Sequence, residues 1–142
     1  MPGMAKLNDA ARQVIESGAL AHLVTLNPDG SPQVAVVWMG FDGDHLIAAH
    51  LDGGQRKLAN LRRDPRVSVS FEAGFNEVGT RDHIVVHGTA EIVEGGAPEL
   101  LNRLAKTYIG PAAEYPPMPD PPAGFVTRIT VNRVSGVGEW AA

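Results

Sequence analysis

Residues 52–67 read DGGQRKLANLRRDPRV and hold five of the twelve lysine and arginine residues of this 142-residue chain. Residues 56–66, which contain these five cations and Asp64, carry a charge of +4, whereas the whole chain carries −4. The pattern predicts a short helix, because Asp52 can cap its start, leucines recur one turn apart, and Pro65 ends it. A cationic segment in an acidic protein indicates an anionic partner of limited size.

The position of each cation along this helix separates two roles. Arg62 and Arg63 fall in the last turn, where positive charge complements the helix dipole. Arg56 and Lys57 fall in the first turn, where positive charge is unfavourable unless an anion binds there. We therefore expect a phosphate at the start of the helix, held by backbone N–H groups and both side chains. The alternative is that both are solvated surface cations.

The composition sets the class of protein. A chain of 15.0 kDa is expected to form one domain over residues 1–142. It contains no cysteine, so neither disulfides nor thiolate chemistry is expected. The start, Met1 to Lys6, lacks the apolar core of a signal peptide, and no apolar run has the length of a membrane span. A cytoplasmic protein that binds neither membrane nor nucleic acid is the expectation.

The hydrophobic periodicity predicts a mainly β protein with a few helices. One helix is expected after a cap at Asn8 or Asp9, ending at Gly18, and another at Pro98–Ile109. Strands are expected at Ala19–Leu26, Gln33–Phe41, His45–His50, Val67–Phe71, His83–Val93 and Phe125–Val137. Gly88 is expected at a bulge or a close approach, and 74–81 and 111–122 are expected to be loops. Six or seven hairpin-connected strands indicate a small antiparallel barrel.

Three segments carry a resemblance to a known family. They read LVTLNPDGSPQV at 23–34, RKLANLRRDPRV at 56–67 and VHGTAEIV at 86–93. Together they resemble the split-barrel flavin and deazaflavin oxidoreductases, the pyridoxamine 5′-phosphate oxidase-like proteins. The F420-dependent branch is the most similar. The resemblance extends over residues 7–140 and implies a split antiparallel β-barrel that forms a homodimer.

The same resemblance implies a cofactor in a groove between two subunits. Its phosphate would be held by Arg56 and Lys57, and its ring system and ribityl chain would lie beside Gln33–Trp38 and Ala48–His50. The expected cofactor-binding residues are Gln33, Val36, Val37, Trp38, Ala49, His50, Gln55, Arg56, Lys57 and Asn60.

Several of these residues also have structural interpretations. Trp38 is either a core or interface aromatic or a residue that stacks on the cofactor ring. His50 is either a pocket residue or a polar residue at a strand end, and Asn60 is expected to fix the helix by hydrogen bonds to backbone. Many members of the family that this chain resembles have a basic residue at the position of Gln55.

The function implied is that of an oxidoreductase that moves a hydride between reduced F420 and a small acceptor such as an enone or a quinone. The cofactor would carry the chemistry, so no catalytic side chain is expected, and the histidine spacing indicates no metal site. The glutamate tail of F420 calls for further cations, with Arg62, Arg66 and Arg81 as candidates. The acceptor would bind beside the loops at 74–81 and 111–122.

Two alternatives remain open from the sequence. An FMN enzyme of the same fold needs only one phosphate site, and a non-catalytic carrier of F420 or a haem-like ligand would bind without turnover. Pyridoxamine phosphate is not expected as the substrate, because the end of the chain, GVGEW at 136–140, lacks the arginine motif of the true oxidases.

Overall fold

The computed structural model describes residues 5–140, so the expectation about a leader at Met1 to Met4 lies outside the described residues. The strands are β1 (Ala21–Leu26), β2 (Pro32–Val37), β3 (Gly40–Asp42), β4 (His45–His50), β5 (Arg66–Phe75), β6 (Arg81–Glu94) and β7 (Phe125–Val137). The helices are α1 (Asp9–Glu16), α2 (Arg56–Arg63) and α3 (Ala97–Tyr108). A mainly β chain with a few helices is confirmed. No helix in the described part is long and apolar enough to span a membrane.

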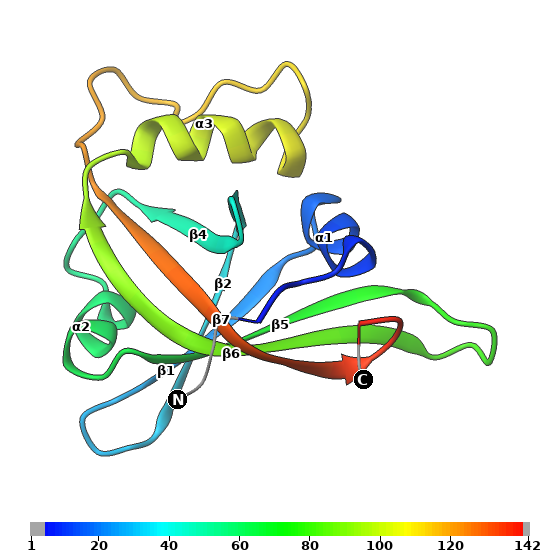
Figure 1. Ribbon diagram of the computed structural model, residues 1–142. Coiled ribbons are helices and arrows are strands. Elements are labelled where there is room, and N and C mark those ends of the chain that lie inside the picture. Colours follow the sequence, from blue (N-terminus) through cyan, green and yellow to red (C-terminus); the bar gives the residue numbers. More distant parts are fainter. Residues whose placement is uncertain (1–4, 141–142) are drawn as a thin grey trace.

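One antiparallel sheet contains all seven strands, in the order β2-β1-β5-β6-β7-β4-β3. Its two edge strands, β2 and β3, follow each other along the chain and are joined only by Trp38 and Met39. A flat sheet of this size would be about 29 Å wide at ~4.8 Å per strand. The two joining residues reach about 11 Å at most. The sheet therefore has to curl until its edges meet, which gives the split antiparallel barrel of Figure 1.

This closure corrects one expectation. Residues 33–41 were expected to form a single strand, but the chain leaves the sheet at Trp38 and Met39 and starts β3 at the opposite edge. The Tyr108 hydroxyl lies at this split, where it donates to the Ala19 carbonyl (2.7 Å) and accepts from the Met39 N–H (3.1 Å). A second expectation, that 74–81 is all loop, is also wrong, since β5 continues to Phe75 and β6 begins at Arg81.

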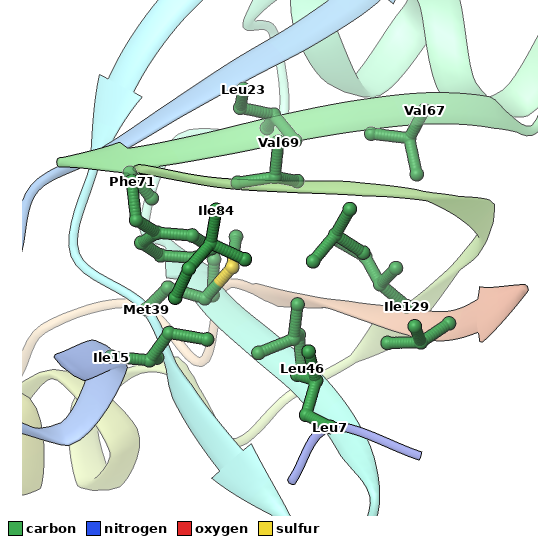
Figure 2. Close-up of a cluster of buried hydrophobic side chains, with 14 of the residues drawn as sticks. Leu7, Ile15, Leu23, Met39, Leu46, Val67, Val69, Phe71, Ile84 and Ile129 are labelled. Atoms are coloured by element: carbon green, nitrogen blue, oxygen red, sulfur yellow. The ribbon is translucent and has the colours of Figure 1, made fainter. Parts of the chain in front are cut away.

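The barrel interior is filled by alternate residues of the strands. Figure 2 shows Leu23, Val69, Phe71, Ile84 and Ile129 converging on this core, and all five are almost completely buried. The register of β6 against β7 shifts between His87 and Gly88, as a bulge requires. A side chain at Gly88 would meet the Thr130 carbonyl oxygen at 2.1 Å, so the expected close approach is confirmed.

The helices attach to different parts of the barrel. The Asn8 side chain accepts from the Ala11 N–H (2.9 Å) and caps α1, as expected. In contrast, Asp52 does not cap α2: it accepts from the Gly54 N–H in the preceding turn, and Gln55 occupies the cap position. Figure 1 shows α3 above β4 and α2 beside β6 and β1, in agreement with their contacts.

Candidate cofactor-binding site

Asn60 holds α2 against the barrel. Its side chain is 1% exposed and donates to Thr25 Oγ1 (3.0 Å) on β1 and to Asn27 Oδ1 (3.1 Å) in the following turn. Arg63 donates to Asn60 Oδ1 and to the Leu26 carbonyl. The expected role in fixing the helix is therefore present, but the partners of Asn60 are side chains rather than backbone. This network determines where the first turn of α2 lies.

The first turn of α2 presents two cations with different surroundings. Arg56 is exposed, whereas Lys57 is half-buried, and burial lowers the pKa of its ammonium group. Within residues 5–140 neither side chain forms a salt bridge. A partly desolvated ammonium without a counter-charge at a helix start is unfavourable, and a bound anion would reverse this. The donor set here therefore fits a phosphate.

Lys57 lines a surface cavity of about 250 Å³. The lining residues are Leu20, Val36, Val37, Trp38, Ala49, Lys57, Leu101 and Tyr115. Lys57 is their single charged member, and the others are apolar or aromatic. The structure thus brings together five of the expected residues, from the end of β2, the split, β4 and α2. A cavity with one cation and apolar walls suits a ligand that is part anion and part flat ring system.

The other expected residues lie outside this lining. Gln33 is on β2 opposite Thr25, Gln55 precedes α2, and Arg56, next to Lys57 in the sequence, is exposed. His50 is 3% exposed and lies within hydrogen-bond distance of Thr127 (Nε2 to Oγ1, 2.8 Å). Burial, with a smaller contribution from the Lys57 charge, lowers the pKa of His50 to about 4. His50 therefore belongs to the buried side of the barrel wall.

Three lining residues were not expected from the sequence. Leu20 precedes β1, Leu101 is on α3, and Tyr115 lies in the proline-rich segment 111–122. The proline-rich segment was expected near the acceptor, and Tyr115 brings it to the cavity. The other expected loop, 74–81, forms the tip of the β5–β6 hairpin and contributes no lining residue to this cavity. Figure 1 shows that hairpin extending away from α2.

The cations considered for a cofactor tail already have intramolecular contacts. The Arg66 guanidinium pairs with Asp64 (2.8 Å), and Arg81 donates to the Ala73 carbonyl and lies over the Phe75 ring. The Arg62 guanidinium, in the last turn of α2, lies 5.2 Å from the centre of the Phe125 ring. Of the three, Arg62 is nearest in sequence and element to Lys57.

A second, larger hollow of about 570 Å³ lies on the outer face of the sheet. One row of cross-strand neighbours runs over this face: Val34, Val24, Ser68, His87 and Arg133. Val34 and Val36 on the edge strand β2 are 60% and 56% exposed. Since Val36 also lines the smaller cavity, the apolar part of this face continues into it.

The chain belongs to the family described as pyridoxamine 5′-phosphate oxidase, whose model matches residues 7–138. The fold of this family is the split barrel, which is a flavin-binding fold. Among solved structures, an F420 reductase is similar with a TM-score of 0.73 and 25% identity, over 91% of this chain and 98% of that one.

Two further solved structures are similar. The conserved hypothetical protein Rv2991 from Mycobacterium tuberculosis has a TM-score of 0.71 and 26% identity, over 94% of this chain and 85% of that one. An FMN-binding protein from Syntrophomonas wolfei has a TM-score of 0.65 at 17% identity, over 90% of this chain and 84% of that one, and shares the fold.

Proposed function

We propose that this chain is an F420-dependent oxidoreductase that acts as a homodimer and passes a hydride to a small organic acceptor. The observation that carries the proposal is Lys57, the single charged side chain in an otherwise apolar and aromatic cavity at the start of α2. The similarity to an F420 reductase over nearly the full length of both chains supports the choice of cofactor.

The residues of this chain would bind and orient the reactants. Lys57, Arg56 and the N–H groups at the start of α2 would hold the cofactor phosphate. Val36, Val37 and Ala49 would lie beside its ring system and exclude water. When bound, a reduced deazaflavin supplies a hydride, and the acceptor takes that hydride at carbon and a proton from water.

The homodimer is proposed because β2 is an uncharged edge strand. Its sequence, PQVAVV, presents two exposed valines and none of the charges that protect free sheet edges. A second copy placed on this face would cover Val34 and Val36 and close the side of the cavity to which Val36 belongs. The cofactor would then lie at the subunit interface.

FMN is the second candidate cofactor. It ends in one phosphate, which the start of α2 can bind without further cations. The pairing of Arg66 with Asp64 favours this candidate, because it leaves fewer cations for a charged tail.

The cofactor is tested by titrating the protein with F420 and with FMN at equal salt. We expect F420 to bind at least tenfold more tightly, about 1.4 kcal/mol, and the excess to shrink as salt rises, because exposed tail contacts are screened over about 8–10 Å. Protein purified with bound FMN would favour the second candidate. Oxidation of reduced F420 with a panel of enones and quinones separates an enzyme from a carrier, which would bind without turnover.

The dimer is tested by sedimentation at micromolar concentration. We expect Val36→Asp to give monomers and to weaken F420 binding, since a buried unpaired carboxylate is costly. Val93→Asp is the matched control, because Val93 is also exposed (45%) but lies on β6 rather than on β2. A wild-type monomer that binds F420 with full affinity would contradict a site between subunits.

A further inference from the structure

Three aromatic side chains from distant parts of the chain form one cluster at the split of the barrel. Trp38 stacks on Tyr108 with ring centres 5.3 Å apart and planes 11° apart, and Tyr115 packs on Trp38 at 5.3 Å and 60°. We call these three residues the aromatic wall. Trp38 and Tyr115 line the cavity, and Tyr108 lies behind Trp38.

Hydrogen bonds fix both outer members of the aromatic wall. The Tyr108 hydroxyl is bonded to the Ala19 and Met39 backbone across the split. The Tyr115 N–H donates to Asn102 Oδ1 (3.1 Å) on α3, and the Lys106 ammonium donates to the Ala113 carbonyl (2.7 Å). The proline-rich segment is thus attached to α3 at two points. Because proline restricts the backbone as well, Tyr115 is positioned before any ligand arrives.

The charges around the aromatic wall limit the ligands that it can accept. Lys57 is the single cation of the cavity and would be occupied by the cofactor phosphate. Neither cation of α3 lines the cavity: Arg103 donates to the Phe41 carbonyl and Lys106 to the Ala113 carbonyl. An anionic second ligand would find no counter-charge here. A flat, uncharged ligand would instead pack against the half-buried rings of Trp38 and Tyr115, which line the cavity.

We propose that Leu20, Trp38, Leu101 and Tyr115 form the binding site of the hydride acceptor, and that Tyr115 selects flat, uncharged, conjugated acceptors. This inference rests on the proposed oxidoreductase function and adds the place and the chemical class of the second substrate. Tyr115 acts as a specificity-determining residue, because it contacts the acceptor and leaves the cofactor site at Lys57 unchanged.

The test measures binding through the fluorescence of Trp38. The background variant Trp140→Phe leaves Trp38 as the single tryptophan, since the chain has two. The probes are 1,4-naphthoquinone, its 2-sulfonate, which is anionic, and 1-decalone, which is saturated and not flat. We expect saturable quenching by naphthoquinone, with and without bound oxidised F420, and at least fivefold weaker binding of the other two probes.

Variants of Tyr115 identify its role. We expect Tyr115→Ala to weaken naphthoquinone binding at least fivefold and to leave the Kd of F420 within twofold. Tyr115→Phe, which keeps the ring, and Met118→Ala, an exposed residue of the same segment, are the controls and should bind naphthoquinone like the background protein. Circular dichroism and the melting temperature check that each variant is folded.

Several outcomes would overturn the inference. If F420 displaces naphthoquinone, or if Tyr115→Ala weakens F420 and naphthoquinone equally, the aromatic wall belongs to the cofactor site. If decalone and the sulfonate bind as well as naphthoquinone, Tyr115 does not select flat, uncharged ligands. The proposed function fails separately, by absence of F420 binding to the wild-type protein. In that case naphthoquinone binding that depends on Tyr115 would still support a site for flat ligands.

Discussion

The two sides of the cavity differ in how they are built. The cationic side consists of neighbours in the sequence, Arg56 and Lys57, on the first turn of one helix. The aromatic wall consists of Trp38, Tyr108 and Tyr115, which are separated by up to 77 residues and come from the split, the end of α3 and the proline-rich segment. A local motif is visible in the sequence, whereas a wall assembled from three elements becomes visible only in the folded chain.

The anchoring of the two sides differs as well. Behind the cationic side, Asn60 and His50 are both buried and both bonded to barrel strands, through Thr25 and Thr127. Behind the aromatic wall, Asn102 is half-buried and bonds a loop to a helix. Substitution of the residues behind the cationic side should therefore affect global stability, and substitution of those behind the aromatic wall should have local effects.

The largest expected effect concerns His50 and pH. Its pKa is about 4 in the folded chain and about 6.5 when unfolded, so the unfolded state binds the proton first as pH falls. The contribution of His50 to the free energy of unfolding is fully present above pH 6.5 and is lost as the pH falls from 6.5 to 4, by about 3 kcal/mol. Denaturant unfolding at several pH values measures it.

His50→Gln is the matched control, because glutamine can still reach Thr127 but does not titrate. Its unfolding free energy should fall less between pH 6.5 and 4 than that of the wild type. The remaining slope would include His87, whose pKa is also lowered by burial and by Arg133. Identical slopes in both proteins would show that folding does not lower the pKa of His50.

The next effect concerns the cationic side itself. Lys57→Ala should weaken F420 binding by about 1.5–3 kcal/mol, the range for hydrogen bonds to charged groups, and leave the fold intact. Arg62→Ala should cost far less, because Arg62 lies in the last turn of α2, over Phe125. Titration calorimetry compares the two. Equal losses would show that the position within the helix does not determine the role.

A pair of asparagine variants compares the two anchors. Asn60→Ala should lower the unfolding free energy by about 1–3 kcal/mol, because it leaves Thr25 and Asn27 without this buried partner. Asn102→Ala should lower it by about 0.5–1.5 kcal/mol, since the freed Tyr115 N–H can reach water. Chemical denaturation measures both. A larger loss from Asn102 would reverse the difference between the two sides.

The smallest effect is the alkaline limit of cofactor binding. Burial lowers the pKa of Lys57 below its ordinary 10.5, so its ammonium loses its proton at a lower pH than that of an exposed lysine. Affinity for F420 should fall as the pH rises and be reduced about twofold when the pH equals that pKa. Lys57→Arg stays charged over the range, so a parallel decline in that variant would assign the effect to another group.

The pattern of strands shows how far local reasoning extends. The alternation of apolar and polar residues, together with the turn residues, predicted β1, β4, β6 and β7 to within a few residues. Both signals depend only on residues close together in the sequence. The break at Trp38 and Met39 was missed, since both residues are apolar and continue the strand pattern. The chain leaves the sheet there because the barrel closes. Closure depends on residues far apart in the sequence, so a short stretch of sequence does not reveal it.

The sequence by itself determined the family, the cationic helix and five of the eight residues that line the cavity. These features could be predicted because the position within a helix and the spacing of a motif depend on residues close together in the sequence. Only the tertiary structure decided that His50 and Asn60 face the barrel and that Tyr115 reaches Trp38. Burial and aromatic contact depend on which distant segments meet, and here that follows from curling seven strands until two edges are joined by two residues.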